Sequence, residues 1–445
     1  MSTARLILVA LILATPTILL LDGAVVDGIL AAVTAGTLTI VAMTIPPGET
    51  EHLVTLTRPA AAIAVIPLIW MVVQILSLNA LGLANPIWES AQVALGHPVS
   101  GSISIDPGTT LVALTRYLST LAVTLLSAAV AVDRQRCEWI LFAAVGATAL
   151  IAIVLLSHDV LGLHFLSENS GSPRDEAVDC VALGVIISAT AAIRTFERYE
   201  TRRNDPTRSV PVLKQTAAAC GAALVLCCMA LFFNAAINAI FAIIGGVLML
   251  IAVGVIRRFG GDTRGFSTIA LPAVIAVVLL IANAPGVRTV DLSLGFATHP
   301  SSLSVLLTQR ILADVPWTGI GAGNFAAISP IYRDIEDAAT IVAPTAAAAI
   351  VVELGRPMLW AIVAAITGAA GVLLRAALRR GRDSFFPAAG ASTLVTLLIL
   401  SFGNAGLFGT AISIIAAAVI GSGLAQSKSR TVQPNATLPS PRAVG

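Results

Sequence analysis

Residues 301–334 combine side chains that could do chemistry with an otherwise apolar chain. They read SSLSVLLTQRILADVPWTGIGAGNFAAISPIYRD. Arg310 supplies a permanent positive charge whose planar guanidinium fits the oxygens of a phosphate or carboxylate. Pro316 ends the preceding segment, and the glycines of GIGAGNF, residues 319–325, permit backbone conformations that other residues avoid. Amides in such a loop can approach an anion closely, so this pattern favours binding of a phosphate-bearing group.

The segment before the glycines predicts an amphipathic helix over residues 301–313. Leu303, Leu307 and Ile311 recur at helical spacing, and a serine at the start can cap the helix. We expect this helix to lie on the membrane face. Arg310 would then sit at the bilayer surface, where an unpaired guanidinium is costly, so it should bind an acid or a phosphate.

The composition identifies the elements that must position these residues. The mean hydropathy is +0.93, 57% of residues are hydrophobic and only 11% are charged, which excludes a soluble domain. The basic residues form no continuous patch, so no nucleic-acid partner is expected. The five cysteines lack metal-ligand spacing, and we expect neither a metal nor another cofactor.

Apolar runs separated by basic loops predict an all-α, polytopic bundle of about twelve transmembrane helices. Most of the 26 lysine and arginine residues fall on one side when both termini are cytoplasmic. The predicted spans cover residues 4–21, 24–45, 59–82, 110–132, 139–157, 177–193, 214–233, 239–256, 266–284, 358–378, 384–403 and 405–424. Residues 1–424 would form the transmembrane domain, and residues 425–445 a disordered cytoplasmic tail.

Any chemistry should face outward, because the long loops lie on that side. They cover residues 83–109, 158–176 and 285–357, the last between spans nine and ten. Loops of this length inside a compact protein usually carry function.

Two of these loops resemble the O-antigen ligase and polymerase family of bacterial envelopes. The first resemblance rests on an arginine, a Pro-Trp step and a G-x-G-x-G-N-F motif in the long loop, followed by E-x-G at the next span. The residues that match are Arg310, Pro316, Trp317, Gly319, Gly321, Gly323, Asn324, Phe325, Glu353 and Gly355. The second is the segment 85–110, NPIWESAQVALGHPVSGSISIDPGTT, which is similar to rhizobial-type members.

The resemblance implies a metal-independent glycosyltransferase in the bacterial inner membrane, with its active face in the periplasm. Such enzymes move a glycan from undecaprenyl diphosphate to the lipid A core of lipopolysaccharide, or to a growing polysaccharide such as exopolysaccharide. Arginines hold the diphosphate that leaves, which suits their charge and shape. By this resemblance Arg310 is catalytic, while Trp317, the three glycines and Asn324 bind substrate.

Two family features are absent from this chain. The outward turn between spans seven and eight reads FFNAAINAIF, without the family's second arginine, and Pro344 and Thr345 stand where the family has His followed by Asn or Ser. Arg174 and Arg333 are the candidates to replace the arginine, and His299 is the candidate catalytic base. The other candidate bases are His158, His164, Asp334, Glu336 and Asp337.

The same departures leave two alternatives open. The chain could be a catalytically inactive relative that serves as a scaffold in polysaccharide assembly. It could also be a transporter of lipid-linked glycan, although transporters usually keep ionisable residues inside their spans. The apolar span interiors count against transport.

Overall fold

The chain folds entirely as α-helices over the residues that the structure describes. The fold comes from a computed structural model, which describes residues 2–21, 23–45, 47–77, 82–162, 172–203, 210–234, 236–259, 303–332, 343–379 and 384–428. Within these ranges there are sixteen α-helices and one 3-10 helix, η3 (Gly406–Phe408). An isolated β-bridge joins Ser77 to Ser102. The all-α prediction is therefore confirmed for this part of the chain.

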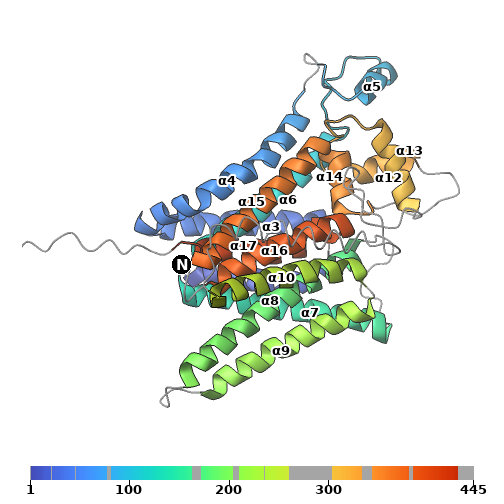
Figure 1. Cartoon of the computed structure of the whole chain (residues 1–445). Helices are drawn as coiled ribbons and strands as arrows, with labels where there is room; N and C mark the ends of the chain where they lie inside the picture. Colours follow the sequence, from blue (N-terminus) through green and yellow to red (C-terminus); the bar gives the residue numbers. More distant parts are fainter. Residues whose placement is uncertain are drawn as a thin grey trace, which may run out of the picture.

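Nine of the described helices are long and apolar enough to cross a membrane. They are α3 (Ala24–Thr44), α4 (Pro47–Ile75), α6 (Pro107–Val130), α7 (Arg134–Leu161), α8 (Ser172–Arg203), α9 (Val210–Phe233), α10 (Ile237–Phe259), α15 (Arg356–Arg379) and α16 (Phe385–Gly403). Figure 1 shows them running alongside one another as a bundle. The chain is a multi-pass membrane protein.

Three of the predicted spans are not among these nine. Residues 4–21 form two short helices, α1 (Ser2–Leu13) and α2 (Thr15–Leu20), because Pro16 lacks the amide hydrogen that would bond to Ile12. The Thr15 hydroxyl donates to the Ile12 carbonyl instead, at 2.7 Å. The last predicted span is α17 (Thr410–Ala425), an apolar helix of 16 residues. The span at 266–284 lies outside the described residues, so it stays a prediction.

Two helices, α8 and α16, form the centre of the bundle and are buried over most of their length. One arginine, Arg194 of α8, is 1% exposed at the end of this core. It forms an ion pair with Glu138 of α7, and its guanidinium lies 5.1 Å from the centre of the Phe385 ring. A buried guanidinium is tolerated because a carboxylate and aromatic faces replace its water.

Short helices form a cap at one end of the bundle, opposite the end where the N-terminus lies (Figure 1). The cap contains α5 (Ile87–Leu95), α12 (Leu303–Asp314), α13 (Phe325–Tyr332) and α14 (Ala346–Leu354). Its apolar core joins Ile311 of α12 and Phe325 of α13 to Val352 of α14 and Phe402 of α16. The cap is thus packed onto the bundle by side chains from both parts.

Candidate functional site

The glycine loop at 319–325 wraps around the end of α14. The amide of Ile320 donates to the Val352 carbonyl at 3.1 Å, and the amide of Gly321 donates to the Glu353 carbonyl at 3.0 Å. The backbone φ angles of Gly319 and Gly321 are 79° and 102°, and an added methyl at Gly319 would overlap the Glu353 carbonyl. Glycine is required here by both conformation and space. The G-x-G-x-G-N-F and E-x-G parts of the sequence motif therefore form one structural unit.

Asn324 ties this unit to the first large loop. Its side chain is fully buried, and its amide donates to the Ser104 hydroxyl at 2.9 Å and to the Ile320 carbonyl at 3.1 Å. The amide of Ile105 donates to the same Ile320 carbonyl at 3.0 Å. The segment 85–110 and the glycine loop, which carry the two resemblances, therefore meet directly. Asn324 acts here as a buried link between them.

The α4 helix also contacts this unit, through two side chains near its C-terminal end. Trp70 donates its indole hydrogen to the Leu354 carbonyl at 2.9 Å, and the amide of Gln74 donates to the Glu353 carbonyl at 2.9 Å. Gln74 is fully buried. These bonds satisfy the last carbonyls of α14, which have no partner within the helix. The position of Glu353 is thereby held by three segments of the chain.

The carboxylate of Glu353 occupies the place where we expected the glycine loop to bind an external anion. Its Oε1 accepts the amide hydrogen of Phe325, the first residue of α13, at 3.1 Å, and the amide of Gly323 also bonds to it. Amides at a helix N-terminus favour a negative partner. Burial nevertheless dominates and raises the pKa of Glu353 to about 7. Glu353 is partly exposed as a residue, although protein atoms surround its carboxylate closely enough for burial to dominate its pKa, and it lies outside the candidate spans.

Arg310 lies on the exposed face of α12. Leu307 and Ile311 of its apolar stripe are buried, and Ile311 belongs to the cap core. The predicted amphipathic helix is confirmed at 303–314, but its stripe contacts protein, where we had expected the membrane face. The reason is that α13 and α14 supply apolar partners that the sequence pattern of one helix cannot reveal.

Trp317 is the most exposed aromatic residue of the motif, with 65% of its surface accessible. Its backbone carbonyl packs against Gly355, so the Trp317 and Glu353 segments are neighbours. An exposed indole costs free energy in water and is suited to stacking on a sugar.

Arg174, near the start of α8, contacts the turn where the resemblance expects a second arginine. Its guanidinium donates to the side-chain oxygen of Asn234 at 3.1 Å, and Asn234 directly follows α9 at the turn toward α10. It also pairs with Asp159 of α7 at 3.0 Å. The side chain of Arg174 is 51% exposed, so a face of it stays accessible.

A line of asparagines connects this turn to the cap. Asn238, at the start of α10, donates to the Gly403 carbonyl at 2.6 Å, and Asn404 donates to Asp179 of α8 at 2.6 Å. The Asn404 carbonyl in turn accepts the amide of Ala346, the first residue of α14, at 2.8 Å. Arg174 and α14 are therefore parts of the same end of the bundle.

Several predicted site residues lie outside the described residues. These are His299, Arg333, His164, Asp334, Glu336 and Asp337, so their roles stay predictions. His158 is described and is buried at the end of α7. At the position of the family's His-Asn pair, the hydroxyl of Thr345 accepts the amide of Ala348 at 3.1 Å and caps α14.

Sequence reasoning missed a pair of charges within the spans. Arg116 of α6 forms an ion pair with Asp27 of α3 at 2.6 Å, and Asp27 accepts a hydrogen bond from Thr410 of α17 at 2.9 Å. A cavity of about 20 Å³ lies beside them. Such a pair satisfies both charges within a low-dielectric region and joins three helices. No spacing in the sequence links residues so far apart.

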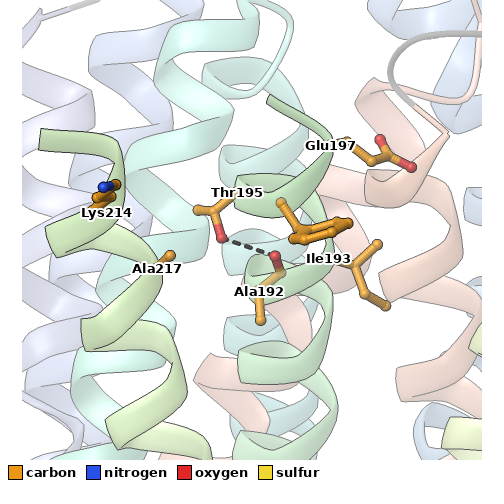
Figure 2. Close-up of a pocket in the computed structure, with 7 residues that line it drawn as sticks. Ala192, Ile193, Thr195, Glu197, Lys214 and Ala217 are labelled. Atoms are coloured by element: carbon orange, nitrogen blue, oxygen red, sulfur yellow. Dashed lines mark hydrogen bonds between the residues drawn. The ribbon is translucent and has the colours of Figure 1, made fainter. Parts of the chain in front are cut away.

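A separate groove lies elsewhere on the described part of the molecule. It has a volume of about 750 Å³ and lies between α8 and α9, near the end of α8 opposite Arg174 (Figure 2). Its walls are mostly apolar and include Ile193, Phe196 and Ala217, with Lys214 and Glu197 at its sides. An open groove of this kind in a spanning helix pair suits lipid chains better than a polar substrate.

Comparison with known proteins assigns no family to the chain. No protein-family model matches it, and no curated protein is found to match its sequence.

Proposed function

We propose that this protein transfers a glycan from undecaprenyl diphosphate to an acceptor at the periplasmic face of a bacterial inner membrane, as an O-antigen ligase or polysaccharide polymerase does. One observation supports this proposal above all. The two segments that resemble that family, 85–110 and 310–325, meet Glu353 in a single cap at one end of a helical bundle. Loops that recognise the same substrate are expected to meet in this way.

Two arginines at this end of the bundle support the handling of a diphosphate. Arg310 lies on the exposed face of α12, and Arg174 replaces the missing arginine of the α9–α10 turn. Both side chains are partly or largely exposed. When the bond between the sugar and the diphosphate breaks, negative charge develops on the leaving oxygen, and guanidinium groups stabilise it.

The distribution of basic residues supports the orientation. With the N-terminus in the cytoplasm, the cap faces the periplasm, where lipid-linked glycans and their acceptors meet. The acceptor is then the lipid A core or the end of a growing polysaccharide, and the membrane itself delivers the donor. Trp317 is placed to contact the sugar.

A reconstituted assay tests this proposal. The purified protein is placed in liposomes with a glycan on undecaprenyl diphosphate and either acceptor, and the product is followed by mass. We expect transfer by the wild type and at least a 100-fold loss in Arg310→Ala and Arg174→Ala. Arg136→Ala is the control, because Arg136 pairs with Asp133 before α7, at the far end of that helix from Asp159. Full activity of the two variants would contradict the assigned roles.

A second candidate function, transport of lipid-linked glycan, gains support from two buried acids in α8. Glu176 is 2% exposed and Asp179 is fully buried, and both lie inside a candidate span. Buried ionisable residues in spans often mark ion or substrate pathways. Movement of a labelled lipid-linked glycan across vesicles, without transfer to an acceptor, would favour this function. The scaffold alternative would be favoured if the purified protein showed no transfer and no transport, while cells that lack it still lost their polysaccharide.

A further inference from the structure

Glu353 is a carboxylate whose position is unusually well determined for a residue in a cap. Its carbonyl accepts hydrogen bonds from Gly321 and Gln74, and its Oε1 accepts one from Phe325. Both the backbone and the side chain are thus held by the motif. A group that must accept a proton from a bound substrate needs such fixed geometry.

The second feature of Glu353 is access. The side chain is only partly buried, whereas its neighbours Val352 and Leu354 are buried. The adjacent Trp317 segment presents an exposed indole, and Arg310 lies on the exposed face of the neighbouring α12. A carboxylate, an aromatic surface and a guanidinium therefore belong to segments that pack together within one cap.

We propose that Glu353 is the catalytic base that accepts the proton of the acceptor hydroxyl. This inference rests on the glycosyl transfer proposed above and names the group that replaces the missing histidine. The hydroxyl oxygen of the acceptor attacks the anomeric carbon and forms the new glycosidic bond. The bond from that carbon to the diphosphate oxygen breaks, and its electron pair leaves with the lipid diphosphate. The hydroxyl proton passes to Glu353, which later releases it to water.

The hydrogen-bond pattern leaves Glu353 able to perform this step. The amides of Phe325 and Gly323 orient the carboxylate, and because its two oxygens offer about four acceptor sites, it retains the capacity to accept a proton. The pKa of about 7 means that a large fraction is ionised at neutral pH, while the affinity for a proton exceeds that of an ordinary carboxylate. Thr345 cannot take this role, because a hydroxyl is a poor base and its oxygen caps α14.

The test compares Glu353→Gln with Glu353→Asp in the liposome assay. Gln keeps an acceptor for the Phe325 amide but cannot take up the proton, so we expect its rate to fall at least 100-fold. Asp keeps the base at a shorter reach and should retain a fraction of the activity. The wild-type rate should rise with pH, with a midpoint near 7, and this dependence should be absent from the residual activity of Glu353→Gln.

The matched control is Glu51→Gln, which changes an exposed carboxylate near the start of α4, at the end of that helix far from Trp70 and Gln74. It should transfer at the wild-type rate with the wild-type pH profile. Melting curves of all variants establish that each is folded. Wild-type rates and pH profile in Glu353→Gln would overturn the role of Glu353 and leave the transfer proposal standing. No transfer by the wild-type protein with any acceptor would overturn both.

Discussion

Two glutamates in this protein make similar contacts but lie in different surroundings. The Oε1 atom of Glu176 accepts the amides of Ala411 and Ile412 at the start of α17, at 2.7 and 3.1 Å. The Oε1 atom of Glu353 accepts the amide of Phe325 at the start of α13. Each carboxylate satisfies orphan amides at the N-terminus of a helix that is distant in sequence.

The difference between the two lies in what covers them. Glu176 is 2% exposed inside a candidate span, and a methyl group added to Gly409 would overlap its carboxylate. Glu353 lies in the cap and is partly exposed. Burial keeps the Glu176 carboxylate away from solvent on the cap side, whereas the partly exposed Glu353 can exchange a proton with a bound substrate. Exposure, more than hydrogen bonding, distinguishes Glu353 as the candidate catalytic carboxylate from the buried Glu176.

The largest expected effect concerns the buried Glu176. Glu176→Ala removes the acceptor of two buried amides, and we expect it to lower the free energy of unfolding by about 3 kcal/mol. The measurement is thermal unfolding in detergent. Glu176→Gln keeps one acceptor oxygen and should lose less than half as much. Equal melting temperatures for the wild type and both variants would contradict the expected role of Glu176 in stabilising the fold.

For Glu353 we expect the stability of the protein to depend on pH. The pKa of Glu353 is raised from 4.5 to about 7, so the folded state holds a proton that the unfolded state has lost between these values. The stability from this proton is fully present below pH 4.5 and is lost as the pH rises through about 7. Glu353→Gln should therefore be more stable than the wild type at pH 8 by about 1–3 kcal/mol, and similar at pH 5.

Melting curves of both proteins in one detergent, between pH 5 and 8, measure this difference. Other titrating groups cancel because they are common to both proteins. Parallel curves across the range would show that Glu353 does not titrate there, and the contrast with Glu176 would disappear.

The smallest expected effect lies at the start of α14. Thr345→Ala removes the hydroxyl that accepts the Ala348 amide, which should cost about 1 kcal/mol. Because α14 carries Glu353 at its other end, the same change should lower the transfer rate a few-fold. Thr345→Ser keeps the hydroxyl and should behave as the wild type in both measurements. A loss of stability as large as that of Glu176→Ala would show that the start of α14 contributes as much to folding as the buried Glu176 does.

Much of the fold could be predicted from the sequence. The nine candidate spans overlap nine of the predicted ranges, because length and hydropathy are local properties of the chain. The break at Ala14 was missed, although Pro16 could have signalled it. The amphipathic helix before the glycine loop was also found from its spacing, within two residues at its start.

The candidate site could be predicted only in part. The spacing around Arg310 identified the loop, and the glycines identified a place where amides approach an anion. The sequence could not identify this anion as the carboxylate of Glu353, because Glu353 lies 28 residues beyond Phe325 along the chain. The pairing of Arg174 with Asn234 spans 60 residues and was equally hidden.

Local patterns in the sequence were enough to identify a polytopic helical membrane protein and the stretch that holds its most unusual residues. Hydrophobic length, proline and glycine act locally, so they can be read from neighbouring residues. Which buried groups face one another, and that Glu353 is partly exposed while Glu176 is buried, follows from the three-dimensional packing. Burial depends on atoms contributed by distant helices, and a linear pattern carries no information on those contacts.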